Sequence, residues 1–115
     1  MNEPRVSIVI PTRNAGEGFR AVLAAIRAQE PAGPEVEIVV VDSGSTDATL
    51  DLARQFGAQA ISIPAHDFNH GETRNLGIRH SRGSLVGCLV QDARPANRGW
   101  LPPLGILLRA DGLAV

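Results

Sequence analysis

Two apolar runs rich in β-branched residues constrain this chain more than any other feature. The first is RVSIVIP near the N-terminus, and the second is VEIVVVD, which closes on Asp42. Such runs are typical of strands that are buried on both faces of a parallel sheet. Between the runs, apolar residues recur at the period of a helix with one buried face: Phe19, Val22, Leu23 and Ile26. We therefore expect a strand at residues 5–10, a helix at 16–29 and a strand ending at Asp42.

The alternation of strand and helix continues along the chain. SGSTDATLDLARQFG predicts a second helix, with Ser45 or Thr46 as its N-cap and Gly57 at its C-terminal end. AQAISIP predicts a third strand, NHGETRNLGIRHS a third helix and GSLVGCLVQD a fourth strand. Because strands joined by helical crossovers run parallel, the predicted fold class is α/β: an open, mostly parallel sheet with flanking helices in βαβαβαβ order.

Composition bounds the domain and excludes several functions. With 115 residues the chain can form one small domain, and its net charge of −1 shows no basic excess for nucleic acid. All eleven basic residues are arginine, so a lysine nucleophile is excluded. The lone Cys88 lies in an apolar run and is expected to be a small buried hydrophobe. No apolar stretch has membrane length, so the expected compartment is the cytosol, with peripheral attachment to the inner membrane face as an alternative.

Polar clusters follow three of the predicted strands. They are Pro11-Thr12-Arg13-Asn14, Asp42-Ser43-Gly44-Ser45 and Gln91-Asp92-Ala93. In open parallel sheets ligands bind outside the carboxyl ends of the strands, so these clusters should share one edge. Two uses of Asp42 remain open: capping the next helix, or accepting hydrogen bonds from a nucleobase or a ribose hydroxyl. GxGxxG and P-loop motifs are absent, which disfavours a dinucleotide or P-loop site.

The segment HDFNHGETRNLG carries more polar side chains than a helix start requires. Asn69 and Glu72 have the spacing of a capping box, so their expected role is structural. Gly71 would let the backbone approach a ligand closely. Arg74, one turn further on, would point to the same edge of the sheet and could clamp a phosphate with both arms of its guanidinium.

Four segments from residue 5 to residue 100 together resemble the successive signatures of the family 2 glycosyltransferases with the GT-A fold: VSIVIPTRNAG, EIVVVDSGSTDAT, FNHGETRNLGIRHSRGS and LVQDARP. The FNHGETRN and QDA versions are most similar to members described as rhamnosyltransferases. The resemblance implies transfer of a hexosyl or rhamnosyl group, with inversion, from a nucleotide-diphosphate sugar to a glycan or lipid-linked acceptor.

The resemblance also implies the residues of the donor site. These are Pro11, Thr12, Asn14, Asp42, Ser43, Gly71, Arg74, Gln91 and Asp92. In the family a D-x-D motif holds a divalent metal, Mn²⁺ or Mg²⁺, against the diphosphate. Here the motif falls at residues 90–92, where Val90 stands in place of the first Asp. Asp92 is therefore the expected metal ligand of a DXD-like motif.

A catalytic base is not recognisable in the sequence. Inverting transfer needs a carboxylate to deprotonate the acceptor hydroxyl, and Asp111 is the only carboxylate after Asp92. We therefore expect residues 1–115 to form the donor-binding half of a GT-A domain without its acceptor half, with little or no transferase activity alone. Strand four would then have a bare edge, which favours self-association.

Two alternatives remain from the sequence. One is a non-catalytic module that binds a nucleotide or a nucleotide-sugar. The other is a receiver-like doubly wound domain, which requires an acidic pair after strand one and a lysine near the end. The first strand ends in PTRN and the chain has no lysine, so the receiver is disfavoured.

Overall fold

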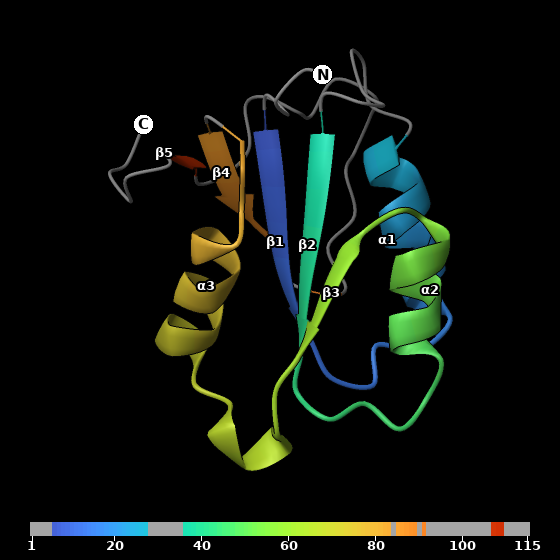
Figure 1. Ribbon diagram of the computed structural model, residues 1–115. Helices are drawn as coiled ribbons and strands as arrows, with labels where there is room; N and C mark the ends of the chain where they lie inside the picture. Colours follow the sequence, from blue (N-terminus) through green and yellow to red (C-terminus); the bar gives the residue numbers. More distant parts are fainter. Residues whose placement is uncertain (1–5, 28–35, 84, 90, 92–106, 110–115) are drawn as a thin grey trace.

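The computed structural model describes residues 6–27, 36–83, 85–89, 91 and 107–109. Its strands form a sheet in the order β3-β2-β1-β4-β5 (Figure 1). The strands are β1 (Val6–Thr12), β2 (Val36–Asp42), β3 (Gln59–Ser62), β4 (Leu85–Cys88) and β5 (Leu107–Arg109). The helices are α1 (Gly18–Arg27), α2 (Thr49–Gln55) and α3 (His70–Arg79), with a 3₁₀ turn, η2 (Ala65–Asp67), before α3.

The pairing of the strands confirms a mostly parallel sheet. β1 pairs in parallel with both β2 and β4, and β2 pairs in parallel with β3. β5 adds an antiparallel partner to β4. The prediction that the fourth strand has a bare edge is therefore wrong, because β5 occupies that edge. None of the described helices is both long and apolar enough to cross a bilayer.

Helices cover both faces of the sheet, α1 and α2 on one side and α3 on the other (Figure 1). Successive residues of β1 alternate between the two layers, as a pleated strand requires. Ile8 and Ile10 pack with the four predicted apolar residues of α1, whereas Val9 belongs to the α3 layer. A Cβ at Gly77 would lie 2.3 Å from Val9 Cγ1, so glycine lets α3 pack directly on the sheet.

Two local predictions need correction. The first strand extends to Thr12 rather than stopping at residue 10, with Pro11 inside it. Because pairing of β1 with β4 ends at Val9, the missing N–H of Pro11 leaves no gap in that ladder. The α2 helix begins at Thr49, and its N-cap residue makes no side-chain cap, so the predicted cap at Ser45 or Thr46 is also wrong.

The start of α3 follows its prediction in part. Asn69 Oδ1 accepts from the backbone N–H of Glu72 at 3.0 Å, which confirms Asn69 as the N-cap. The reciprocal bond is different, because the Asn69 N–H donates to Thr73 Oγ1 rather than to a Glu72 carboxylate. Asn69 and Thr73 thus make the capping hydrogen bonds, and the Arg74 side chain takes no part in them.

Candidate functional site

The strands that carry the polar clusters end at one edge of the sheet. Thr12 at the end of β1 pairs with Asp42 at the end of β2, and β4 runs parallel beside β1. Beyond β4, Gln91 Oε1 accepts a hydrogen bond of 2.8 Å from the Arg13 N–H. The expected convergence of the three strand ends is therefore confirmed within the described residues.

A pocket of about 530 Å³ lies at this carboxyl edge. Its volume is within the range of small-molecule sites. The residues that line it come from the ends of β1, β2 and β4, from the loop before α3 and from α3 itself: Pro11, Arg13, Ser43, Phe68, Arg74, Cys88, Leu89 and Gln91. The wall is largely apolar, with two guanidinium groups among its polar members. Such a lining suits a ligand with a flat or apolar part and an anionic part.

The loops after β1 and β2 are tied together beside this pocket. The Asn14 N–H donates to Ser45 Oγ at 2.8 Å, and Asn14 Oδ1 accepts from the Thr46 N–H at 2.8 Å. Asn14 has φ of 46°, a left-handed conformation that asparagine tolerates better than most residues. Asn14 thus uses both its backbone and its side chain to join the two loops.

Further side chains of the second loop extend this connection. The Ala15 N–H donates to Thr49 Oγ1 at 3.0 Å, and the Gly16 N–H donates to Asp47 Oδ2 at 3.1 Å. The bonds from Thr49 lower the pKa of Asp47, with smaller contributions from Gly16 and from Asp47's own backbone. We call these contacts of residues 14–16 with Ser45, Thr46, Asp47 and Thr49 the loop–loop network. It joins the two loops that carry Arg13 and Ser43, both of which line the pocket.

Asp42 lies beneath the loop–loop network rather than in the pocket wall. Its side chain is 1% exposed. One carboxylate oxygen accepts from Thr12 Oγ1 at 2.7 Å and from Ser45 Oγ, while the other accepts from the Ser45 N–H at 2.9 Å. These bonds compensate the lost hydration of the buried charge. Ser43, the next residue, lines the pocket, but Asp42 does not. A direct contact between Asp42 and a ligand therefore stays a prediction.

The two arginines of the pocket differ from most other arginines of the described chain. Within that part of the chain, neither the Arg13 nor the Arg74 guanidinium makes a hydrogen bond or an ion pair, and both residues are exposed. Arg74 acts on Cys88 through its charge, but burial of the thiol has the larger effect and raises the pKa of Cys88. The thiol is therefore kept protonated and is a poor nucleophile.

The lining residues that the structure describes fit a divalent metal poorly. Mn²⁺ and Mg²⁺ prefer carboxylate oxygen, and the described lining offers a hydroxyl, an amide, a thiol and two cations instead. Among the residues that the structure describes, no three His, Cys, Asp or Glu side chains are grouped to hold a metal. The predicted ligand Asp92 lies outside the described residues.

The structure brings together part of the predicted donor site. Pro11, Ser43, Arg74 and Gln91 line the pocket. Thr12, Asn14 and Asp42 lie behind it in hydrogen bonds between the loops, and Gly71 is in the first turn of α3. Sequence reasoning did not assign Arg13, Phe68, Cys88 and Leu89 to the site, although Arg13 stands within the PTRN cluster that it singled out.

The chain is an α/β domain with a pocket at the carboxyl edge of a parallel sheet, which is the edge where such sheets bind ligands. The sequence profile of Glycosyl transferase family 2 matches residues 7–115, and the chain belongs to this family. The O-antigen chain rhamnosyltransferase RfbN of Salmonella typhimurium is 40% identical over 91 residues, which cover 77% of this chain and 28% of RfbN. The chain spans about a third of the length of the curated relatives it matches.

Solved structures agree with the family. The mannosyltransferase PcManGT from Pyrobaculum calidifontis, in complex with GDP-Man and Mn²⁺, superposes with a TM-score of 0.69 and is 27% identical. That match covers 85% of this chain and 30% of the mannosyltransferase. TarS 1-349 of S. aureus, in complex with UDP-GlcNAc, gives a TM-score of 0.66 at 25% identity, covering 76% of this chain and 26% of TarS. The expected GT-A class is thereby confirmed.

Proposed function

We propose that this chain binds a nucleotide-diphosphate sugar in the pocket at the carboxyl edge of its sheet, as the donor-binding part of an inverting glycosyltransferase. The observation that carries the proposal is the pair of unpaired guanidinium groups, Arg13 and Arg74, in an otherwise largely apolar pocket. Guanidinium binds phosphate oxygens in a two-pronged geometry, and the apolar wall suits a base or the apolar face of a sugar. Family membership and the nucleotide-sugar complexes of PcManGT and TarS support it.

The sugar that we propose is a rhamnosyl group or a related hexosyl group. Support comes from the two relatives named as O-antigen chain rhamnosyltransferases, RfbN and WbaN, which are 40% and 33% identical to this chain. The acceptor proposed from the family is a hydroxyl of a glycan or of a lipid-linked sugar. Self-association, the cytoplasmic location and a metal at Asp92 stay predictions.

The chain's own residues would position the donor rather than activate the acceptor. The described lining contains no carboxylate that could take a proton from an attacking hydroxyl, so it supplies no general base. Its groups instead orient the diphosphate through Arg13 and Arg74 and exclude water along the wall of Phe68 and Leu89. Weak or absent turnover by this chain alone is the corresponding expectation.

Titration with UDP-, GDP- and dTDP-sugars tests this proposal. We expect one nucleotide series to bind measurably by calorimetry and to quench the intrinsic fluorescence or shift resonances of pocket residues. Arg74→Ala should weaken that binding. His80→Ala should not, because His80 is the C-cap residue at the far end of α3. The absence of binding by every member of the panel would refute the donor-binding role.

A non-catalytic nucleotide-binding module is the second candidate. It is favoured by the same lack of a carboxylate in the described lining. A sensitive sugar-transfer assay on the purified chain, run beside the titrations, separates the two candidates. Turnover above the background of an Arg74→Ala variant would identify a transferase, and binding without turnover would favour the module.

A further inference from the structure

Four arginines of the described chain already have an acceptor within the fold. Arg20 contacts Glu17, Arg54 contacts Asp51, and Arg82 contacts Glu37. Arg27 donates to the carbonyl oxygens of Val36 and Phe56. Arg13, Arg74 and Arg79 have no such described partner, and of these three Arg13 and Arg74 line the pocket.

Unpaired guanidinium groups facing one pocket leave donors for an incoming anion. Arg13 reaches the pocket from the loop after β1, and Arg74 reaches it from the first half of α3. Gln91 fixes the first of these positions, because its Oε1 holds the backbone N–H of Arg13 at 2.8 Å. The two guanidinium groups thus approach the pocket from different elements.

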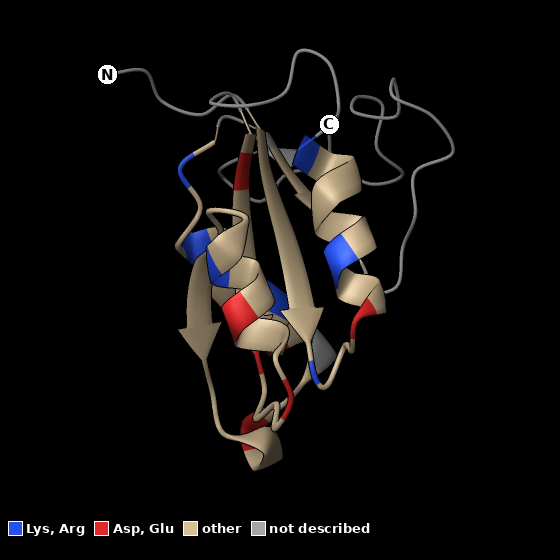
Figure 2. Cartoon of the chain, turned by 90° about the vertical axis from the view of Figure 1, so that its right-hand side faces the viewer, with Lys and Arg blue, Asp and Glu red and all other residues tan. Residues whose placement is uncertain are grey.

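Two carboxylates near this edge, Asp42 and Asp47, are engaged in hydrogen bonds within the loops. Figure 2 shows acidic segments in the loops at the carboxyl end of the sheet, which by themselves would repel a diphosphate. Asp42, however, accepts its hydrogen bonds from Thr12 and Ser45, and Asp47 accepts from Gly16 and Thr49. Neither carboxylate lines the pocket. In the described lining, guanidinium is therefore the charge that faces an anion.

We propose that Arg13 and Arg74 together neutralise the diphosphate of the donor, so that the nucleotide binds without a divalent metal. The inference rests on the proposed donor-binding function and goes beyond it, because a D-x-D family is expected to need the metal for this step. The physical reason is substitution of charge. Two guanidinium groups that line one pocket would meet the phosphate oxygens directly, in a chain that has Val90 in place of the first carboxylate of the motif.

The first test measures binding of UDP, GDP, dTDP and inorganic pyrophosphate to the full chain in EDTA and again with Mn²⁺. We expect the Kd of pyrophosphate and of the preferred nucleotide to change by no more than about threefold between the two conditions. In free energy, this is less than half of the change that a tenfold difference in Kd represents. Arg13→Ala and Arg74→Ala should each raise these Kd values by about tenfold or more in EDTA.

Arg79→Ala is the matched control. Arg79 also lies on α3 and also lacks a described partner, but it does not line the pocket. The substitution removes the same charge from the same helix, so its Kd values should stay within about twofold of the original chain. Thermal melting of each variant establishes that it is folded before its affinity is compared.

A second readout reports on the guanidinium groups themselves. Arg13→Lys and Arg74→Lys each remove one arginine Nε–H resonance and so assign it. In the original chain both resonances should shift when pyrophosphate is added in EDTA. The lysine variants keep the charge but lose the planar fork, so their Kd values should lie between those of the original chain and the alanine variants.

Each outcome separates this inference from the proposed function. Nucleotide binding that disappears in EDTA and returns with Mn²⁺ overturns the inference and leaves the donor site standing. Equal losses for Arg13→Ala, Arg74→Ala and Arg79→Ala also overturn it. Metal-free pyrophosphate binding that depends on both arginines, in a chain that binds no nucleotide of the panel, upholds the anion site and refutes the donor role.

Discussion

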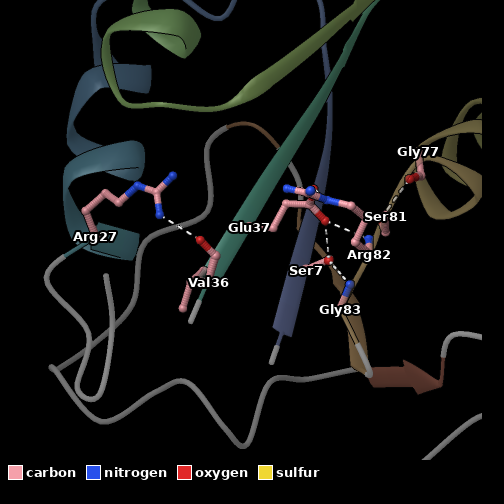
Figure 3. Close-up of polar contacts among 8 residues, drawn as sticks. All are labelled: Ser7, Arg27, Val36, Glu37, Gly77, Ser81, Arg82 and Gly83. Carbon is pink, nitrogen blue, oxygen red and sulfur yellow. Dashed lines mark hydrogen bonds and ion pairs between the residues drawn. The ribbon is translucent and has the colours of Figure 1, made fainter. Parts of the chain in front are cut away.

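The two ends of the sheet use polar residues in different ways. At the carboxyl edge, Arg13 and Arg74 face a pocket, and neither guanidinium group has a described partner. At the amino edge, Arg82 donates from Nε to Glu37 Oε2 at 3.2 Å and from its backbone N–H to Glu37 Oε1 at 2.8 Å (Figure 3). The guanidinium groups at the carboxyl edge thus have no described partner, whereas Arg82 at the amino edge is paired with a carboxylate.

The hydrogen bonds at the amino edge centre on Ser7. Ser7 Oγ donates to Glu37 Oε1 at 2.7 Å and accepts from the Gly83 N–H at 2.8 Å (Figure 3). Ser7 is fully buried, and the Glu37 side chain is only 8% exposed. Because these groups satisfy one another, they anchor the loop between α3 and β4 to the sheet. We call Ser7, Glu37, Arg82 and Gly83 the amino-edge cluster.

The contrast teaches how stability and binding are divided in this fold. In the amino-edge cluster the Arg82 cation is paired with the Glu37 carboxylate, so the two charges balance each other. The carboxyl edge has a matched loop–loop network beneath an unmatched pair of arginines. Guanidinium groups that have no protein partner are available to an anion, which supports the proposed site.

The largest effect is expected for the buried carboxylate of the carboxyl edge. Asp42→Ala removes the acceptor of Thr12 Oγ1 and of two Ser45 donors, and should lower the free energy of unfolding by about 3 kcal/mol. It should also weaken nucleotide binding, because the loops that carry Arg13 and Ser43 lose their anchor. Urea denaturation and calorimetry measure the two changes.

A second variant distinguishes positioning from direct contact by Asp42. Ser45→Ala keeps the carboxylate but removes one of its donors and the acceptor of the Asn14 N–H. If Asp42 acts through the loops, Ser45→Ala should lose a large part of the same affinity. Full affinity in Ser45→Ala together with none in Asp42→Ala would instead indicate that the carboxylate touches the nucleotide.

The next effect belongs to the amino edge and should leave the pocket untouched. A Cβ at Gly83 would lie 2.6 Å from Ser7 Oγ and 2.7 Å from the Ser7 backbone nitrogen. Gly83→Ala must therefore move backbone and should cost about 2 kcal/mol of stability. Gly71→Ala is the control, since its Cβ would meet Asn69 Oδ1 at an ordinary 3.6 Å. Similar melting temperatures for the two variants would contradict the described packing.

A smaller loss is expected when the acceptor of the amino-edge cluster is removed. Glu37→Ala leaves Ser7 Oγ and the Arg82 N–H without their partner and should reduce stability by about 1.5 kcal/mol, with the Kd of the nucleotide unchanged. Glu17→Ala removes an exposed partner of Arg20 and should cost less than about 0.5 kcal/mol. An altered nucleotide Kd in Glu37→Ala would show that the two edges are coupled.

The smallest effect depends on pH. The pKa of Asp47 is lowered in the folded chain, chiefly by the Thr49 hydroxyl, so its ionised form stabilises the fold above the unfolded pKa. This stabilisation is lost as pH falls through the folded pKa. Asp47→Ala should therefore melt below the original chain near about pH 6, with the gap narrowing toward about pH 3. Asp51→Ala removes the carboxylate of an exposed pair with Arg54 and is the control for the loss of a surface charge.

Much of the architecture could be predicted because it follows from local patterns. The β-branched runs of β1 and β2 and the apolar period of α1 each identify their element without reference to the rest of the chain. Asn69 as N-cap and Gly57 in a left-handed turn after α2 are similarly local. The β5 strand was not predicted, because three residues of an edge strand carry too little pattern and owe their conformation to pairing with β4.

The candidate site likewise has features that follow from local patterns and features that do not. The amino-acid sequence alone determined which strand ends carry polar residues and that Arg74 lies on the face of α3 toward them, because strand direction and helical period are properties of the chain itself. Only the tertiary structure decided how those residues are used. Asp42, Asn14 and Ser45 bind one another across two loops about thirty residues apart, whereas Arg13 and Arg74 find no described partner and face the pocket. Hydrogen bonds between distant segments depend on distances that no local pattern encodes. The division between side chains bonded within the fold and side chains that face the pocket therefore appears only once the loops are packed together.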